Sequence, residues 1–567
     1  MTSRSEVSII VGGQPGDGTR VAGNVIGRIF NRLGYHIFIL EDYPSIIRDS
    51  GHTFSQVTVS RDRVWSHFDR IDLLVALNGD TVDRHEKDLV KGGAILYDED
   101  VVRYEGSALG LPIPLTTTVK EAKGRPVMRN SVAIGALAHL HGVPMKTVEE
   151  VFKSVFGAKN LESNLDLAKR GYEHSETNFE RLRVMEPTGS PPRPLITGND
   201  AIVLGAAKAG LRVYIAYPMT PSTSLLHYAV AHRDDLGLVA VQAENEIGVI
   251  NMSLGCVYAG SRTMIGTSGG GFDLMQEAFS LAGMCESPLV VVLSQRTGPS
   301  TGLPTHTAQS DLGLALNAGH GEFPRVVVAP GDVEESFYKA NEALNLAWKY
   351  QVPVIILVDK HLSESTMSAE IDETKATLEE AKLWEGLPER DGYKRYAYAT
   401  DGVSALAFPG SDAVVKSSSY EHTQHGYSTE DPEETERMAE KRFAKLKGIE
   451  RELREKITVK LHGQEDAENL VVSWGSTKGA VIEALKLVDV PIRFIQVLYL
   501  SPFPTWEVEK HLRAARKVVS VEVNFTGQLS KLLRTETGHL VDGTIRRYDG
   551  RPFEPLSLSK ELRRFFG

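Results

Sequence analysis

The sequence predicts an α/β protein built from three α/β domains. Two observations carry this prediction. Apolar segments of strand length alternate with amphipathic segments of helix length along most of the chain, which is typical of parallel sheets covered by helices. The chain also has 567 residues, and a single hydrophobic core stops growing at about 250–300 residues. Several domains are therefore expected.

The first domain is expected over residues 1–185, and a linker follows it. In chain order its segments are the strand EVSIIVGG, the helix TRVAGNVIGRIFNRLG and the strands YHIFIL, IDLLVAL and GAILYD. Residues 186–196, EPTGSPPRPLI, are rich in proline and carry a glycine. This composition predicts a connection between domains rather than a loop within one.

Residues 197–365 are expected to form a second domain with a doubly wound sheet. Asn199 and Asp200 can cap its first helix, AIVLGAAKAG. Helical segments then alternate with six strands, which are RVYIAY, LVAVQ, RTMIGT, PLVVVLS, FPRVVVA and VPVIILV. This alternation predicts a parallel sheet with helices on both faces.

Residues 366–465 interrupt the alternation. They are charged and irregular, and they end in a predicted solvent-facing helix over residues 433–457. A third α/β domain is expected over residues 466–567. Its strands are NLVVSW, PIRFIQV and KVVSVEVN, and helical segments separate them.

The composition excludes several classes of protein. The net charge of −11 argues against binding of nucleic acid. No apolar segment approaches the ~20 residues of a membrane helix, and we expect no signal peptide before the first strand. The two cysteines, Cys256 and Cys285, suit buried thiols in a reducing cytoplasm, where we expect the protein. They are too few for an iron–sulfur cluster held by four thiolates.

A glycine turn, GGQPGDGT, lies between the first strand and the first helix. The backbone N–H groups of Gly13, Gly16 and Gly18 can there surround a phosphate. A dinucleotide site is one interpretation, with Glu41 as the ribose-binding acid. A tight turn for strand–helix packing is another. The turn lacks the Gly-Lys-Ser/Thr of a Walker loop and the asparagine pair of a complete thiamin diphosphate motif.

Four polar features follow successive strands of the second domain, where doubly wound sheets bind ligands. They are Thr220 in YPMTPST, Glu244 and Glu246 after LVAVQ, the turn TSGGGF, and Arg296 after VVVLSQ. Each has a simpler interpretation alone: Thr220 as a helix cap, the acids as partners of a helix dipole, Arg296 as a surface ion pair. Because the loop QRTGPSTGLPTHT places Arg296 and Thr305 as donors, we predict an oxoacid site.

These motifs resemble a known family. YPMTPS, AENEIGVINMSLGCVYAGSRTMIGTSGGGF and QRTGPSTGLPTHTAQSDL are similar to the α subunit of 2-oxoacid:ferredoxin oxidoreductases. GGQPGDG and YPSIIRDSGHT are similar to that family's γ subunit, here fused to the N-terminus. VVSWGSTKGAVIEAL and VEVNFTGQLSKLLR resemble the last α domain. The resemblance implies a pyrimidine-type thiamin-binding domain and a transketolase C-terminal-like domain.

The resemblance also implies roles for residues and for a partner. A β subunit supplies the diphosphate and Mg²⁺ site of thiamin diphosphate and an iron–sulfur cluster. In this chain Glu246 matches the carboxylate on the pyrimidine ring, which favours the imino tautomer that takes the C2 proton. Thr267, Ser268 and Gly269 fall on the cofactor side. The family's 2-oxoacid contacts are matched by Thr220, Arg296 and Thr305.

The expected activity is coenzyme A-dependent oxidative decarboxylation of 2-oxoglutarate to succinyl-CoA, with electrons passed to ferredoxin by a heterodimer with the β subunit. Pyruvate or a broad range of 2-oxoacids is the alternative substrate. A non-catalytic scaffold subunit and an NAD-dependent dehydrogenase built on Glu41 are alternatives of other classes. His306 meets a distal substrate carboxylate, coenzyme A or solvent, and Gly13, Gly16 and Gly18 are candidates for coenzyme A.

Overall fold

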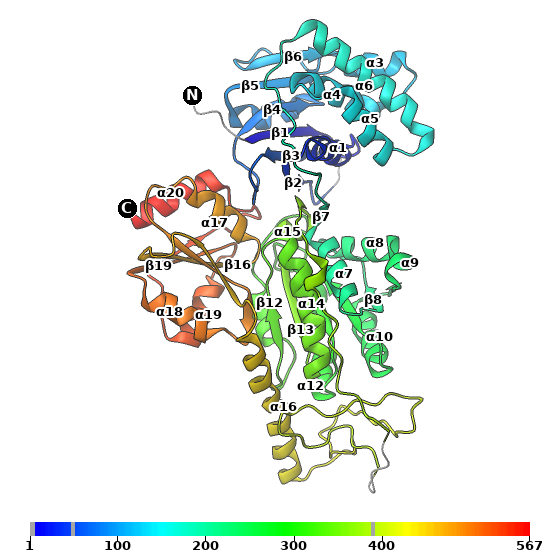
Figure 1. Cartoon of the computed structure of the whole chain (residues 1–567), viewed down its shortest axis with the longest axis vertical. Coiled ribbons are helices and arrows are strands. Elements are labelled where there is room, and N and C mark those ends of the chain that lie inside the picture. Colours follow the sequence, from blue (N-terminus) through cyan, green and yellow to red (C-terminus); the bar gives the residue numbers. More distant parts are fainter. Residues whose placement is uncertain (1–5, 47–50, 387–391) are drawn as a thin grey trace. The chain divides into compact units, whose positions relative to one another are not determined.

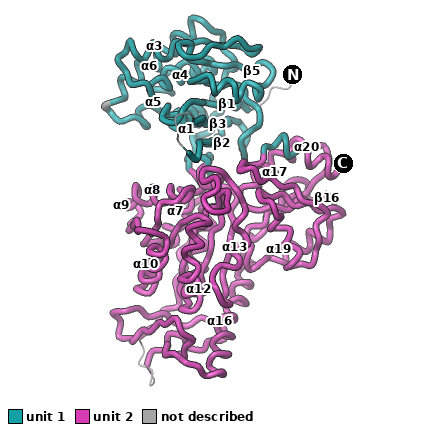
Figure 2. Tube along the Cα trace, turned by 180° about the vertical axis from the view of Figure 1, so that it is seen from behind, with its two compact units in different colours: residues 1–196, 365–370, 554–560 teal, residues 197–364, 371–553, 561–567 magenta. Residues whose placement is uncertain are grey.

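The computed structural model describes residues 6–46, 51–386 and 392–567, and the chain divides into two compact units (Figure 2). Unit 1 contains residues 1–196, 365–370 and 554–560, and unit 2 contains residues 197–364, 371–553 and 561–567. The described residues form three sheets with helices, which confirms the predicted α/β class (Figure 1). The five predicted domain segments stay a finer prediction within this division.

Unit 1 is built on an eight-stranded sheet of order β6-β5-β4-β1-β3-β2-β14-β7. The strands are β1 (Glu6–Gly13), β2 (His36–Asp42), β3 (Thr53–Ser60), β4 (Ile71–Ala76), β5 (Leu89–Asp98), β6 (Leu109–Ile113), β7 (Leu195–Thr197) and β14 (Thr366–Ser368). The alternation of strands and helices had predicted a parallel sheet for the first domain, but the observed sheet is mixed. β3 is antiparallel to both β1 and β2. Only residues 43–52 connect β2 to β3, and a parallel crossover needs about a dozen or more residues.

Helices cover this sheet. They are α1 (Thr19–Arg32), α2 (Gly79–His85), α3 (Leu115–Glu121), α4 (Arg129–Leu140), α5 (Met145–Val155) and α6 (Ala158–Asn178), with 3₁₀ turns η1 (Glu86–Asp88) and η2 (Pro126–Met128). The predicted linker lies along the same unit: the Asn31 side chain donates to the Arg193 carbonyl at 2.8 Å and accepts from its N–H at 3.0 Å.

Helices α4 and α6 approach closely because glycine lies at their contact. A Cβ atom at Gly135 would lie 2.7 Å from the carbonyl carbon of Ala168, and one at Gly171 would lie 2.8 Å from that of Val132. Real Cβ atoms do not come so close to backbone. The absence of a side chain at these positions therefore sets the spacing of the two helices.

Gly135→Ala should destabilise unit 1 by about 3 kcal/mol, because the new methyl group must push two packed backbones apart. The urea-denaturation midpoint of the full chain checks this. Gly79→Ala is the matched control, since no atom lies within 4 Å of a Cβ atom there. Equal midpoints for the two variants would contradict the packing argument.

Unit 2 contains a seven-stranded sheet of order β18-β12-β13-β11-β10-β8-β9. Its strands are β8 (Val213–Ala216), β9 (Val239–Gln242), β10 (Thr263–Thr267), β11 (Val290–Gln295), β12 (Val326–Val328), β13 (Val354–Asp359) and β18 (Tyr499–Ser501). All neighbours pair in parallel except β18, which is antiparallel to β12. The predicted doubly wound sheet is present.

Helices lie on both faces of this sheet, and α14 packs against α7 (Figure 1). Successive residues of β11 enter two separate cores: Val290 and Val292 one, Val291 and Leu293 the other. This alternation is what a sheet buried on both faces requires. The helices are α7 (Gly198–Lys208), α8 (Thr223–Ala231), α9 (Arg233–Leu236), α10 (Glu246–Tyr258), α11 (Gly269–Asp273), α12 (Gln276–Met284), α13 (Leu312–Asn317), α14 (Val333–Tyr350) and α15 (Lys360–Glu364).

A five-stranded sheet of order β15-β17-β16-β19-β20 completes unit 2. Leu470, Val472 and Trp474 of this sheet share one core with residues of the seven-stranded sheet. Its elements are β15 (Val459–Gly463), β16 (Asn469–Trp474), α17 (Thr477–Leu485), β17 (Arg493–Val497), α18 (Thr505–Arg513), β19 (Lys517–Glu522), α19 (Gln528–Thr537) and β20 (Gly543–Arg546). The last helix, α20 (Pro555–Phe566), is divided, with residues 555–560 in unit 1 and residues 561–566 in unit 2.

The connection between these sheets holds the 3₁₀ turn η3 (Glu373–Lys375) and α16 (Pro432–Leu453). The predicted solvent-facing character of this helix is wrong. Lys441 and Lys445 are buried and form ion pairs with the buried Glu286. Burial opposes the ionisation of Glu286, but Lys441, Lys445 and Arg395 outweigh it and hold its pKa below the usual range. The charged helix α16 therefore has a buried face.

Candidate active site

Four neighbouring parallel strands, in the order β11-β10-β8-β9, bring the predicted site residues to one edge of the seven-stranded sheet. Thr220 follows β8, Glu246 follows β9, the glycine turn follows β10 and Arg296 follows β11. Carboxyl ends of parallel strands meet at the same edge, which is where doubly wound sheets bind ligands.

The turn that carries Thr220 contacts Arg296 directly. Arg296 Nη1 donates to the carbonyl oxygen of Thr220 at 2.8 Å. Asn199 also stabilises this turn, because its side chain donates to the Pro221 carbonyl at 2.9 Å. Helix α8 starts after Ser222 and has no side-chain cap, so Thr220 does not act as its cap.

Glu246 is the first residue of α10 and is 3% exposed. Its Oε1 atom is buried and has no hydrogen-bond partner among the described residues. Asn245 caps the helix by accepting from the Gly248 N–H at 2.9 Å, so Glu246 is not needed for that task. Burial of an unpaired carboxylate oxygen is costly, and such an atom is suited to accept a hydrogen bond from a ligand.

The turn after β10 closes over this carboxylate. A Cβ atom at Gly271 would lie 2.7 Å from Glu246 Oε1 and nearer still to Thr267 Oγ1. Ser268 Oγ is a second buried polar atom without a hydrogen-bond partner among the described residues. Thr267 and Ser268 thus lie with Glu246 around a position that only glycine can occupy.

Asp311 belongs to the same group of residues, and the sequence interpretation missed it. Its Oδ2 would lie 2.6 Å from a Cβ atom at Gly269, and its N–H donates to Gln295 Oε1 at 2.9 Å. Burial, with repulsion from Asp273, raises its pKa to about 6. The quoted motif THTAQSDL contains this residue, but it follows no strand, so the strand-end argument could not find it.

The arginine of the site lies between carboxylates. Burial lowers the pKa of Arg296, and the charges of Asp311 and Glu246 oppose that shift. The site therefore combines one half-buried guanidinium with two acids, an arrangement that can bind an anion while its net charge stays small.

Asp311→Asn should stabilise the isolated chain at pH 7 but not at pH 4. Because the native pKa is raised to about 6 from 3.8, the native chain binds more protons than the unfolded chain between these values, and its stability falls as the pH rises through them. The gain at pH 7 should be about 1–3 kcal/mol. Thermal midpoints at both pH values check it; the same gain at both would exclude the charge as its cause.

The loop after Arg296 folds back on itself. Thr297 N–H donates to the His306 carbonyl at 3.1 Å, and Leu303 N–H donates to the Thr297 carbonyl at 2.9 Å. Thr307 Oγ1 donates to Asp359 Oδ1 at 3.3 Å and fastens the end of the loop. The predicted contact Thr305 is buried within this loop, on the same segment as Arg296.

In the glycine turn of unit 1, the side chain of Asp17 accepts hydrogen bonds from within the turn and from Arg129. Gln14 N–H donates to Asp17 Oδ2 at 2.8 Å, and Arg129 Nη2 donates to Asp17 Oδ1 at 2.9 Å. These contacts favour the tight-turn interpretation, and the assignment of Gly13, Gly16 and Gly18 to a phosphate or coenzyme A stays a prediction. Glu41 is buried and accepts from Ser55 Oγ at 2.9 Å.

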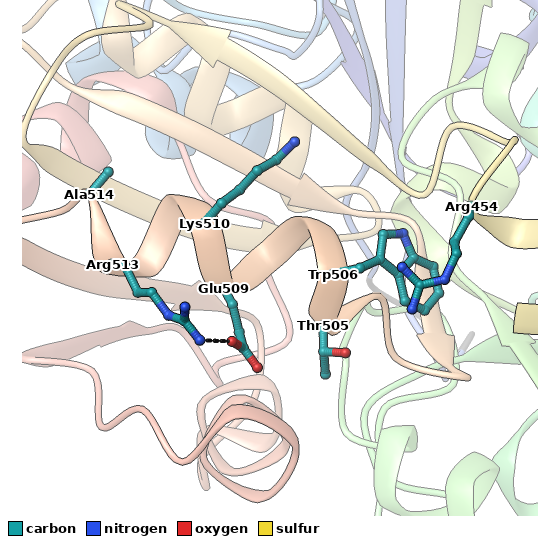
Figure 3. A pocket seen from close by; sticks show the side chains of 7 residues that line it. All are labelled: Arg454, Thr505, Trp506, Glu509, Lys510, Arg513 and Ala514. Carbon is teal, nitrogen blue, oxygen red and sulfur yellow. Dashed lines mark hydrogen bonds and ion pairs between the residues drawn. The ribbon is translucent and has the colours of Figure 1, made fainter. Parts of the chain in front are cut away.

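A surface hollow of about 630 Å³ lies elsewhere on unit 2 (Figure 3). Arg454 lies over the ring of Trp506, 4.5 Å from its centroid. The hollow contains none of the predicted site residues; its lining is Arg454, Thr505, Trp506, Glu509, Lys510, Arg513 and Ala514.

Among the helices that the structure describes, none is both long and apolar enough to cross a membrane.

Two family models match the chain. The model described as pyruvate flavodoxin/ferredoxin oxidoreductase, thiamine diphosphate-binding, covers residues 204–441. The model described as pyruvate ferredoxin/flavodoxin oxidoreductase covers residues 8–174. The first match contains every residue predicted to contact cofactor or 2-oxoacid.

Relatives match almost the full length. The 2-oxoacid:ferredoxin oxidoreductase 2 subunit alpha of Aeropyrum pernix is 33% identical over 99% of this chain and 97% of its own. The 2-oxoglutarate oxidoreductase subunit KorA of Mycobacterium tuberculosis is 30% identical over 99% and 91%. The solved 2-oxoglutarate:ferredoxin oxidoreductase from Magnetococcus marinus, with 2-oxoglutarate, coenzyme A and succinyl-CoA bound, is 32% identical, with a TM-score of 0.90 over 100% of both chains.

These matches confirm the resemblance drawn from the motifs and the prediction of an oxidoreductase. They also agree with the geometry, because the strand-end residues that the motifs supply form one group around a buried carboxylate. The chain therefore belongs to the 2-oxoacid:ferredoxin oxidoreductase family, as the alpha subunit of such an enzyme.

Proposed function

We propose that this alpha subunit, together with a β subunit, oxidises 2-oxoglutarate to succinyl-CoA and CO₂ and passes the electrons to ferredoxin. The observation that carries the proposal is the buried, unpartnered Oε1 of Glu246 beside the Gly271 turn. The choice of acid is supported by the Magnetococcus marinus structure, which holds 2-oxoglutarate, coenzyme A and succinyl-CoA and matches this chain end to end.

The residues present fit the aminopyrimidine of thiamin diphosphate. Glu246 Oε1 and Ser268 Oγ are buried polar atoms that need partners, and the missing side chain of Gly271 leaves space between them and Thr267. When bound, thiamin diphosphate supplies a nucleophilic carbon and an electron sink for decarboxylation. Glu246 would accept a hydrogen bond from the pyrimidine ring nitrogen, and Thr267, Ser268 and Gly269 would border the ring.

Arg296, Thr220 and Thr305 would hold the substrate. A guanidinium has five N–H donors, and one of those of Arg296 meets the Thr220 carbonyl. The remaining donors can bind the 1-carboxylate of a 2-oxoacid in the bidentate manner that arginine favours. The hydroxyls of Thr220 and Thr305 would orient the acid next to that carboxylate. A fixed orientation of this kind can supply much of the rate enhancement.

We further propose that the β subunit covers the outer face of α10. From residue 247 to residue 260 this stretch carries no charged side chain, and Ile247 and Met252 are about half exposed. The same helix starts at Glu246, so a partner seated there reaches the cofactor site. That partner would hold Mg²⁺, the diphosphate and the iron–sulfur cluster, since this chain has only two cysteines.

Ile247→Asp should prevent assembly with the β subunit, because it places a charge in the centre of an apolar contact. Co-purification of tagged alpha subunit with its partner measures this. Val101→Asp is the matched control: Val101 is equally exposed but lies in unit 1. Normal co-purification of the Ile247 variant would exclude this face.

The test of the proposed function is co-expression with the matching β subunit, followed by assays of viologen or ferredoxin reduction with a panel of 2-oxoacids and coenzyme A. We expect the highest kcat/KM with 2-oxoglutarate. A preference for pyruvate would overturn the substrate assignment, and no activity with any 2-oxoacid would overturn the proposal as a whole. Such an enzyme would work in the cytoplasm, where the two reduced thiols are also expected.

A further inference from the structure

We propose that Gln309 is a positioning residue of the active site and that the C-terminal motifs VVSWGSTKGAVIEAL and VEVNFTGQLSKLLR hold it in place. This inference rests on the proposed function and extends it to a part of unit 2 with no predicted contact to cofactor or 2-oxoacid. It is carried by hydrogen bonds between the segment 307–313, which follows the loop after Arg296, and one turn of each motif, all within unit 2.

The side chain of Gln309 is fully buried at the carboxyl ends of β16 and β19. Its Nε2 donates to the Trp474 carbonyl at 2.8 Å, and its Oε1 accepts from Thr477 Oγ1 at 2.8 Å and from the Val523 N–H at 3.0 Å. A backbone N–H can only donate and a carbonyl can only accept. The amide of Gln309 therefore has a single orientation that satisfies both motifs.

The backbone of Gln309 is held by the second motif as well. Its N–H donates to the Val523 carbonyl at 2.7 Å, and its carbonyl accepts from Asn524 Nδ2 at 3.1 Å. In the first motif, Gly475 has a φ of 58°, and a Cβ atom there would lie 2.8 Å from Gln309 Nε2. Glycine suits this position both by its conformation and by the space that it leaves for the amide.

The second motif also holds the residues that follow Gln309. Gln528 Nε2 donates to the Ser310 carbonyl at 2.7 Å, and the Gly313 N–H donates to Gln528 Oε1 at 3.0 Å. The side chain of Gln528 therefore bridges the two sides of Asp311, which borders Gly269 in the candidate active site.

Strand ends of the seven-stranded sheet contact the same segment from their own side. Gln295, the last residue of β11, accepts from the Asp311 N–H at 2.9 Å. Asp359, the last residue of β13, accepts from Thr307 Oγ1 at 3.3 Å and from Ser476 Oγ of the first motif at 2.6 Å. The segment 307–313 is thus fixed by both sheets, and Gln309 is the residue that both motifs hold.

These contacts bear on substrate binding because of what lies next to Gln309 in the chain. Thr305, a proposed substrate contact, comes shortly before it, and Asp311 comes two residues after it. Glu246 lies on α10, outside the segment. A shift of the segment should therefore weaken the binding of 2-oxoacid more than it slows the chemistry at the cofactor.

The test measures KM and kcat of Gln309→Met and Thr477→Val in the complex with the β subunit, with the 2-oxoacid that the wild type prefers. Methionine keeps the length of the side chain but loses the three hydrogen bonds of the Gln309 side chain. We expect KM to rise about fivefold or more while kcat changes less than about twofold. Thr477→Val removes one of these bonds and should raise KM by a smaller factor, which tests the inference even if Gln309→Met fails to assemble.

Gln496→Met is the matched control, because it is the same substitution at an equally buried residue. Gln496 Nε2 donates to Glu335 Oε2 at 2.6 Å and so joins the five-stranded sheet to α14 rather than to the segment 307–313. Its KM should stay at the wild-type value. Equal increases in Gln309→Met and Gln496→Met, or a wild-type KM in Gln309→Met, would overturn the inference.

A second measurement separates this inference from the proposed function. The N–H groups of residues 309, 311 and 313 are all hydrogen-bonded, so hydrogen–deuterium exchange in this segment of the complex should be slow. Gln309→Met should speed it by about tenfold or more, and Gln496→Met should not. Unchanged exchange in Gln309→Met would overturn the role of Gln309. A wild-type complex that shows the expected exchange but acts on no 2-oxoacid would count against the proposed function alone.

Discussion

Glu246→Gln is expected to lower the kcat of the assembled enzyme by about 100-fold or more. The carboxylate is buried, its Oε1 has no hydrogen-bond partner among the described residues, and general acid–base groups contribute about 10²–10⁴ in rate. Glutamine keeps the shape of the side chain but carries no charge. Because the change is isosteric, folding and assembly should be unaffected.

The control for this variant is Glu244→Gln, two residues earlier. Glu244 is exposed, so its neutralisation should leave kcat within about twofold, as surface changes usually do. Steady-state rates of 2-oxoglutarate-dependent viologen reduction measure both. If Glu246→Gln kept the wild-type rate, the chain would be a scaffold and its catalytic assignment would be wrong.

Gly271→Ala should cost nearly as much activity without changing a single polar group. The added Cβ atom would lie 2.7 Å from Glu246 Oε1 and would overlap Thr267 Oγ1, so the carboxylate must move. A displacement of about 1 Å in a catalytic group can cost about 100-fold in rate. The affinity for thiamin diphosphate should fall as well.

The adjacent glycine provides the comparison. No atom lies within 4 Å of a Cβ atom at Gly270, so Gly270→Ala changes the same turn without filling it. Titration of both variant complexes with thiamin diphosphate, followed by activity, should show a defect for Gly271→Ala alone. A similar defect in both would mean that the turn, and not the space beside Glu246, determines activity.

Much of this fold follows from periodicity alone. Strands buried on both faces, such as β11, appear in the sequence as unbroken apolar runs, and their alternation with helices predicted the doubly wound sheet. The failures have physical causes. β3 pairs with β2 in an antiparallel manner, and the alternation of strands and helices does not predict such a pair. In α16 the buried face is lined by Lys441 and Lys445, which pair with Glu286 more than 150 residues away, so no local pattern can reveal it.

The residues of the candidate site could likewise be predicted only in part. Thr220, Glu246 and Arg296 could be grouped because each follows a strand, and adjacent parallel strands end together. Asp311 was not predicted because it lies beyond a loop and comes close to Gly269 only in the folded chain. Contacts between distant segments depend on the tertiary structure, and a single sequence holds no direct record of them.

The central claim is that Glu246 of this chain acts through a cofactor shared with the β subunit. The most direct measurement is the rate of deuterium exchange at C2 of thiamin diphosphate in the assembled complex, without any 2-oxoacid. We predict fast exchange in the wild type and exchange slower by about 100-fold or more in Glu246→Gln, at equal cofactor occupancy. Equal exchange rates in the two complexes would contradict the claim.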